Sequence, residues 1–175
     1  MSIDYSAYLF QPLDRHFIDF VVAEVLANPV DFEKIYRLVI DKEKTVAWRA
    51  AWACHKISEK HPEWFTEKQF LELTELAIAT SEQGLRRGCL STLCNLKLPE
   101  PIPVELINAC FDWMVSPHEA IAVQAKSMRM LQKICRVIPE FKSELKICLE
   151  TVDFDCYSAG FKSTRKNVLK ELNRK

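Results

Sequence analysis

The chain has 175 residues with 24 basic and 24 acidic side chains, so its formal net charge is zero. One domain of this length can fill a core from its 49% hydrophobic residues, which argues against a disordered chain. With 3 glycines and 8 prolines, the chain has too few turn-forming residues for a barrel or sandwich of many short strands. The isolated glycines at 84, 88 and 160 also exclude a glycine-rich phosphate-binding loop.

The first predicted element is a helix at about 15–27, which would cap the exposed end of the first helix pair. After it, two kinds of helix alternate with a period of about 38 residues. We call the first helix of each pair the A helix and the second the B helix. The apolar positions of the A helices are Phe32, Ile35, Leu38 and Val39, then Phe70, Leu73, Leu76 and Ala77, then Ile107, Cys110, Phe111 and Met114, and finally Leu145, Cys148 and Leu149.

The B helices repeat a spacing of i, i+4, i+8 and i+11, which places four residues on one face of an α-helix. Three sets are almost wholly apolar or small, whereas the fourth contains Arg165, so the last repeat is either degraded or slightly shifted in register. The four sets are Val46, Ala50, Cys54 and Ile57; Leu85, Cys89, Leu93 and Leu96; Val123, Ser127, Leu131 and Ile134; and Phe161, Arg165, Leu169 and Leu172.

Capping residues and prolines mark the predicted helix boundaries. Thr66-x-x-Gln69 predicts a capping box that opens the second A helix, and Thr80-x-x-Gln83 could open the next B helix. Ser116-Pro117-His118-Glu119 combines an N-cap serine, a proline at the first helical position and a glutamate after it, and Asn28-Pro29-Val30-Asp31 has the same form. Prolines at 62, 99, 101, 103 and 139 fall between helical segments.

The segment Val46-Ala47-Trp48-Arg49-Ala50-Ala51-Trp52-Ala53, followed by His55-Lys56-Ile57, resembles the second helix of a HEAT repeat. The Pro29-Val30-Asp31 and Pro103-Val104-Glu105 junctions fit the same resemblance, which covers about residues 28–175. HEAT-like or armadillo-like proteins are all-α, and the resemblance implies an α-α superhelix of about four helix pairs with an N-terminal cap. We therefore expect one domain over 1–175, with the cap at 1–28 and repeats at about 29–65, 66–102, 103–139 and 140–175.

The sequence favours a cytoplasmic protein. Its start, Met1-Ser-Ile-Asp-Tyr-Ser, lacks the pattern of a signal peptide, and no stretch of 18 apolar residues predicts a membrane span. The seven cysteines are an odd number without a C-x-x-C pair, so we expect buried thiols in a reducing compartment and no disulfide framework or zinc site.

The neutral total conceals a difference between the two kinds of helix. The B windows (45–60, 82–97, 119–136 and 162–175) contain 16 basic and four acidic residues, whereas the A windows (31–44, 67–81, 104–118 and 137–161) contain 7 basic and 14 acidic residues. If the B helices line the concave side, that surface is basic and could bind an anionic partner such as nucleic acid, an acidic peptide or an acidic protein. The alternative is a solvated face whose bases balance neighbouring acids.

Two tryptophans give this surface a candidate anchor. Trp48 and Trp52 are four residues apart, with Arg49 between them and Lys56 one turn further on. An exposed tryptophan beside an arginine suits base stacking or peptide anchoring, although the pair could also simply cover a repeat interface. The expected partner-binding residues are Trp48, Arg49, Trp52 and Lys56 at one end, with Arg87, Lys126, Arg129 and Lys133 in the middle.

No catalytic, metal or cofactor site is evident in the sequence. It has no H-E-x-x-H or G-x-S-x-G motif, and the adjacent Cys54 and His55 point about 100° apart on a helix, so they cannot form a dyad. The tryptophans and bases resemble the groove of the HEAT-like alkylpurine DNA glycosylases, but no acid occupies the middle of a B helix. The sequence thus favours a non-enzymatic module that binds an acidic protein or other anionic partner, with nucleic-acid binding as the alternative.

Overall fold

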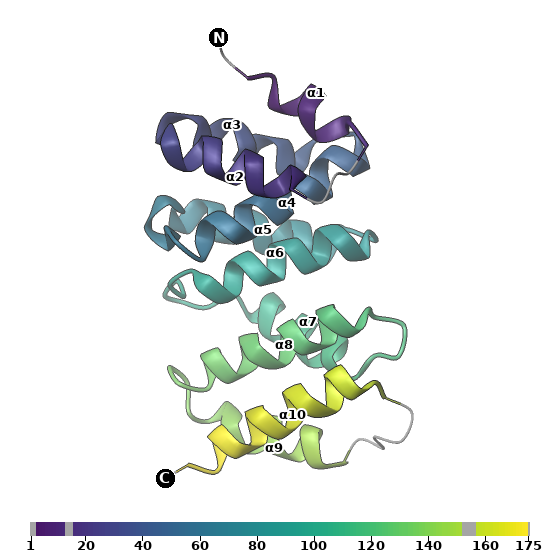
Figure 1. Cartoon of the computed structure of the whole chain (residues 1–175). Helices are drawn as coiled ribbons and strands as arrows, with labels where there is room; N and C mark the ends of the chain where they lie inside the picture. The colour runs from purple at the N-terminus through teal and green to yellow at the C-terminus, as the bar shows by residue number, and fades with distance from the viewer. Residues whose placement is uncertain (1–2, 13–15, 152–156, 175) are drawn as a thin grey trace. The chain divides into compact units, whose positions relative to one another are not determined.

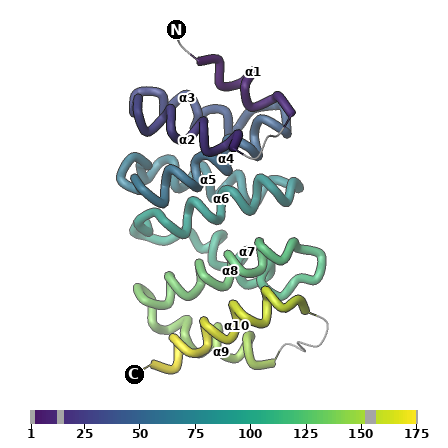
Figure 2. The backbone as a smooth tube through the Cα atoms, viewed as in Figure 1, coloured from purple at the N-terminus to yellow at the C-terminus, as the bar shows by residue number. Residues whose placement is uncertain are grey.

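The computed structural model describes residues 3–12, 16–151 and 157–174, and within these ranges every regular element is helical. Figure 1 shows the α-helices in chain order, and Figure 2 follows the same path as a tube. Their bounds are α1 Tyr5–Phe10, α2 Phe17–Ala27, α3 Phe32–Arg37, α4 Lys44–Ser58, α5 Glu67–Ala79, α6 Gln83–Asn95, α7 Val104–Val115, α8 Ile121–Ile134, α9 Phe141–Thr151 and α10 Ala159–Leu172. Short 3₁₀ turns occupy Pro29–Asp31, Leu38–Ile40 and Pro62–Trp64.

The chain forms two compact units, Met1–Lys97 and Leu98–Lys175. In the first, which we call unit 1, α4 packs against α2 and α6, while the A helices α3 and α5 pack against α4 and α6. A close approach joins α4 to α6, because a Cβ atom at Gly88 would lie 2.7 Å from the Cβ atom of Ala51. In the second, unit 2, α8 packs against α7 and α10, and α9 packs against both α8 and α10.

The predicted apolar faces form the cores. All four predicted positions are buried in each of the first three B helices, which confirms the i, i+4, i+8, i+11 spacing for α4, α6 and α8. In α10 only Phe161 of the predicted set is buried, and Val168 joins it, whereas Arg165, Leu169 and Leu172 are half-buried. The predicted register of the last repeat is therefore wrong beyond its first turn. Because α10 packs mainly on α8 and α9, it buries a narrower face than a helix with a neighbour on each side.

Some of the predicted helix boundaries are confirmed and others are wrong. Thr66 and Gln69 form the predicted capping box, with the Thr66 Oγ1 accepting from the Gln69 backbone N–H at 3.2 Å. The box predicted at Thr80 is wrong, because α6 begins at Gln83 with Glu82 as its N-cap. Asn28 precedes the 3₁₀ turn that starts at Pro29, without a capping bond from its side chain.

The helix start predicted at Ser116 is also wrong, because α8 begins at Ile121 with Ala120 as its N-cap. Ser116 instead ends α7, and its carbonyl oxygen accepts a hydrogen bond from the Gln124 Nε2 at 2.6 Å. At the other end of the chain, the short helix α1 was not predicted. The carboxylate of Asp4 caps it by accepting from the Ala7 N–H at 3.0 Å.

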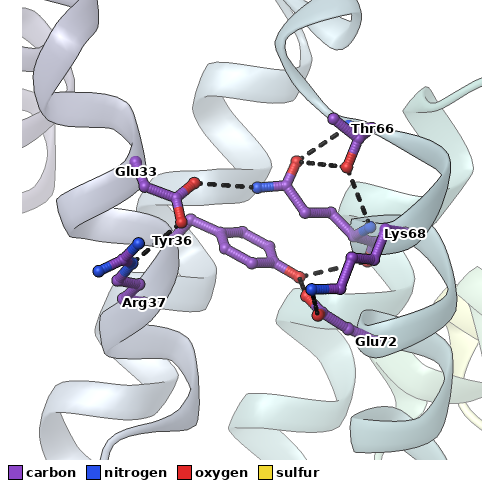
Figure 3. Close-up of polar contacts among 7 residues, drawn as sticks. Glu33, Tyr36, Arg37, Thr66, Lys68 and Glu72 are labelled. Carbon is purple, nitrogen blue, oxygen red and sulfur yellow. Dashed lines mark hydrogen bonds and ion pairs between the residues drawn. The ribbon is translucent and has the colours of Figure 1, made fainter.

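A polar network joins α3 to α5 in unit 1, as Figure 3 shows. The buried Tyr36 hydroxyl donates to the Glu72 Oε2 at 2.7 Å, and the Gln69 Nε2 donates to the Glu33 Oε2 at 3.3 Å. Burial and the Glu72 carboxylate raise the pKa of Tyr36, because both disfavour the phenolate. This network links the consecutive A helices α3 and α5 of unit 1.

Candidate partner-binding site

Trp48 and Trp52 lie on the side of α4 that faces away from the buried positions of that helix, and both are half-buried. Their rings stack nearly parallel, with centroids 6.0 Å apart and planes 15° apart. Trp48 also lies over the first turn of α6, where a Cβ atom at Gly84 would be 3.6 Å from the Trp48 Cβ. The pair therefore covers part of the α4–α6 contact and keeps some aromatic surface available to solvent.

The position of Arg49 corrects the sequence-based expectation. Arg49 is only 8% exposed, and its Nη1 donates to the carbonyl oxygens of Leu9 at 2.7 Å and Gln11 at 2.6 Å. Its guanidinium carbon also lies 5.5 Å from the ring centroids of both Phe17 and Trp48. This side chain holds the end of α1 against α4, so a partner at the B-helix surface cannot reach its charge.

The other two predicted bases of unit 1 are more accessible. Lys56 is half-buried, and its ammonium forms an ion pair with the Asp19 Oδ1 at 2.7 Å across the α2–α4 contact. The hydrogen bond and the charge of Lys56 lower the pKa of the exposed Asp19 carboxyl. Arg87 is exposed on α6. An anionic partner would thus meet Arg87 directly but would compete with Asp19 for Lys56.

The three predicted bases of unit 2 share one side of α8. Lys126, Arg129 and Lys133 are spaced i, i+3 and i+7, and the central Arg129 lies opposite the buried Ser127 and Leu131. Arg129 is exposed, whereas Lys126 and Lys133 are half-buried. The structure therefore brings these three together, as the helical spacing predicts.

Side chains of the B helices also close the carbonyl ends of the preceding A helices, a role that sequence reasoning missed. The Arg86 guanidinium donates to the carbonyl oxygens of Ala77, at 3.1 Å, and Thr80. Arg165 donates to the Leu149 carbonyl at 2.6 Å. These guanidiniums supply donors and positive charge where a helix leaves unpaired carbonyls and the negative end of its dipole. The only sequence signal is an arginine in the first two turns of each B helix concerned.

The described residues give no support for catalytic thiols or a metal centre. Six cysteines are free thiols, and burial raises the pKa of Cys54 strongly and that of Cys89 to about 12, so these two stay protonated at neutral pH. Cys156, the seventh, lies outside the described residues. Within the described ranges there is no group of three histidine, cysteine or acidic residues that could hold a metal ion, and no helix long and apolar enough to cross a membrane.

Comparison with known proteins gives one match. A family model described as a HEAT repeat domain matches residues 5–172, which runs from the first residue of α1 to the last residue of α10. A search of curated proteins and a search of solved structures each returned no match.

Proposed function

This chain belongs to the HEAT repeat family, and from that premise we propose that it is a non-enzymatic module that binds a protein partner along its B-helix surface. HEAT repeats commonly mediate contacts between proteins, because stacked helix pairs present a long continuous surface. In this proposal Trp48 and Trp52 anchor the partner on unit 1, beside Lys56 and Arg87. Lys126, Arg129 and Lys133 supply positive charge on unit 2.

One observation carries the proposal, namely the stacked tryptophan pair outside the core of unit 1. Large aromatic side chains at the centre of an interface supply a disproportionate share of its binding energy. The pair is also held rigidly, because Trp48 rests on α6 and Trp52 rests on Trp48, so little side-chain entropy is lost when a partner binds. Arg87 is exposed on α6 one turn after Gly84, which lies against Trp48, so the proposed ligand is an apolar side chain flanked by carboxylates.

A random peptide library displayed on phage tests this chemistry with the full chain as bait. We expect enriched peptides that combine one large apolar residue with aspartate or glutamate, and at least tenfold weaker binding by the Trp52→Ala variant. Trp113→Ala is the matched control, because Trp113 is a half-buried tryptophan on α7 in the other unit. Enriched peptides that bind the wild type and Trp52→Ala equally would refute the anchor.

A second function is favoured by the same parallel rings, which could stack on nucleic-acid bases. A site that neutralises about six phosphates gives a slope of about −5 in a plot of log affinity against log salt concentration. Binding of a labelled single strand with that slope, and its loss in Trp52→Ala, would favour nucleic acid over a protein partner. Absence of binding to single-stranded or duplex DNA or RNA at low salt would eliminate this alternative.

A further inference from the structure

Positive side chains gather on α8 and α10 of unit 2 with almost no acids among them. Within the bounds of these two helices the only acidic residue is Glu171, and it is paired with Arg136 at 2.8 Å. We call the lysines of both helices together with Arg129 the α8–α10 basic face; they are Lys126, Arg129, Lys133, Lys162, Lys166 and Lys170, whereas Arg165 of α10 donates to the Leu149 carbonyl. Three of them lie on α10, within the basic window 162–175 of the last B helix.

The two helices present these cations on one face of unit 2. In α8, Arg129 lies opposite the buried positions of the helix, and in α10 Lys166 and Lys170 lie opposite Phe161 and Val168. α8 and α10 lie side by side (Figure 1). An ion pair also joins Glu171 of α10 to Arg136, which lies two residues beyond the end of α8. Because both helices turn their buried sides toward α7 and α9, their exposed sides form a common surface.

Unit 1 uses its B-helix cations differently. Lys44 pairs with Glu82 at 2.7 Å and Lys56 pairs with Asp19, while Arg49 and Arg86 are buried on backbone carbonyls. On the α8–α10 basic face, by contrast, Arg129 and the three lysines of α10 are exposed and make no ion pair with any residue that the structure describes. Among the described residues, four exposed cations without an ion pair thus lie on α8 and α10 of unit 2, whereas α4 and α6 of unit 1 have one, Arg87.

The dimensions of this face fit a short extended chain. Lys162, Lys166 and Lys170 are one helical turn apart, about 6 Å along the axis, and the neighbouring helix lies about 8–10 Å away. The 14 residues of α10 span about 21 Å, the length of about six residues of extended chain. Carboxylates on alternate residues of such a chain recur about every 6.6 Å, close to the spacing of the cations.

The chemistry of the face favours carboxylates over nucleic acid. The only aromatic residue of α8 and α10 is Phe161, which is fully buried, so neither helix has an exposed ring on which a base could stack. Lysine ammonium groups act as point charges without fixed geometry, which suits a flexible ligand of high charge density. The chain as a whole is neutral, so its net charge adds no attraction, and a local basic face of this size suits a short anionic segment.

We propose that the α8–α10 basic face binds a flexible acidic protein segment, about six residues long and rich in glutamate or aspartate. This inference rests on the proposed function and gives the partner a second recognition element in addition to an apolar anchor. In this proposal unit 1 contributes the aromatic contact with the partner, and unit 2 contributes most of the positive charge. Affinity from exposed ion pairs is modest and salt-sensitive, so this element would mainly speed association and orient the partner.

Fluorescence anisotropy with a labelled poly-glutamate peptide tests the proposal directly on the full chain at low salt. The test variant is Lys166→Glu/Lys170→Glu, and the matched control is Lys142→Glu/Lys146→Glu, which reverses two charges at the same i, i+4 spacing on α9 in the same unit. We expect about tenfold weaker binding by the test variant and less than twofold change in the control. Circular dichroism checks that both variants are folded.

Each other outcome overturns the inference. Equal weakening by both double variants would show attraction to overall charge, without a defined face. Tighter binding of an oligothymidylate of equal charge would assign the face to nucleic acid, and no binding of either probe would leave it without an anionic ligand. The Trp52→Ala variant separates this result from the proposed function, because it should bind poly-glutamate normally while losing the peptides selected for an apolar anchor.

Discussion

Replacing Arg49 with methionine removes the guanidinium that ties α1 to α4 and keeps most of the aliphatic stem in place. The lost contacts are two charge-assisted hydrogen bonds, to the carbonyls of Leu9 at 2.7 Å and Gln11 at 2.6 Å. Water can replace the guanidinium at the exposed Gln11, but the Leu9 carbonyl belongs to a residue with no exposed surface. A hydrogen bond to a charged group contributes about 1.5–3 kcal/mol, so we expect Arg49→Met to lower the free energy of unfolding by about 3 kcal/mol.

Urea denaturation followed by tryptophan fluorescence measures this effect in a Trp113→Phe background. The remaining tryptophans, Trp48, Trp52 and Trp64, all lie in unit 1, so the signal reports on that unit. Arg87→Met is the matched control, because Arg87 is exposed on α6 and its replacement should change stability by less than about 0.5 kcal/mol. Equal urea midpoints of unfolding for Arg49→Met and Arg87→Met would refute the argument. They would show that the Arg49 guanidinium is exposed to solvent like that of Arg87.

Three further predictions concern packing, a buried hydrogen bond and a buried thiol. Gly88→Ala should cost about 1–3 kcal/mol because its methyl group would overlap α4, whereas Gly84→Ala, with no atom nearer than 3.6 Å, should be neutral or stabilising by about 0.5 kcal/mol in thermal melts. Tyr36→Phe removes the 2.7 Å bond to Glu72 and should cost about 1–2 kcal/mol in the same assay. The Cys89 thiol, with its pKa raised from 9.0 to about 12, keeps its proton in the folded state after the unfolded chain has lost it, so stability present below pH 9 should fall between pH 9 and pH 12, and less so in Cys89→Ala.

The fold follows from the sequence because burial on a helix has a fixed period. Val46, Ala50, Cys54 and Ile57 are all buried, and the same spacing holds 38 or 39 residues later in α6 and again in α8. The family match over residues 5–172 agrees with the resemblance that this repeat indicates. Periodicity predicts the fold well here because each apolar helix face must be covered by neighbouring helices. The prediction rests on several buried positions for each helix, so a wrong assignment at one position does not change it.

Helix ends were harder to predict, because several residues compete to cap one end. Thr66 caps α5 with its own side chain, and its prediction from sequence is correct. Ser116 has the same local pattern, yet its carbonyl is held by Gln124 from eight residues away and the helix starts only at Ile121. A local motif cannot show that a residue of the next helix will satisfy the same backbone group.

The binding surface was the hardest feature to predict from charge, because a count of basic residues does not show what each guanidinium contacts. Arg49, Arg86 and Arg165 contribute to the basic excess of the B helices, but each donates to backbone carbonyls at the end of an earlier helix. Lys166 and Lys170 contribute equally to that excess and face solvent. A buried arginine contributes to folding and an exposed lysine is available for binding. The excess of B-helix bases therefore includes both buried arginines and exposed lysines. A test of a binding face must mutate only exposed bases.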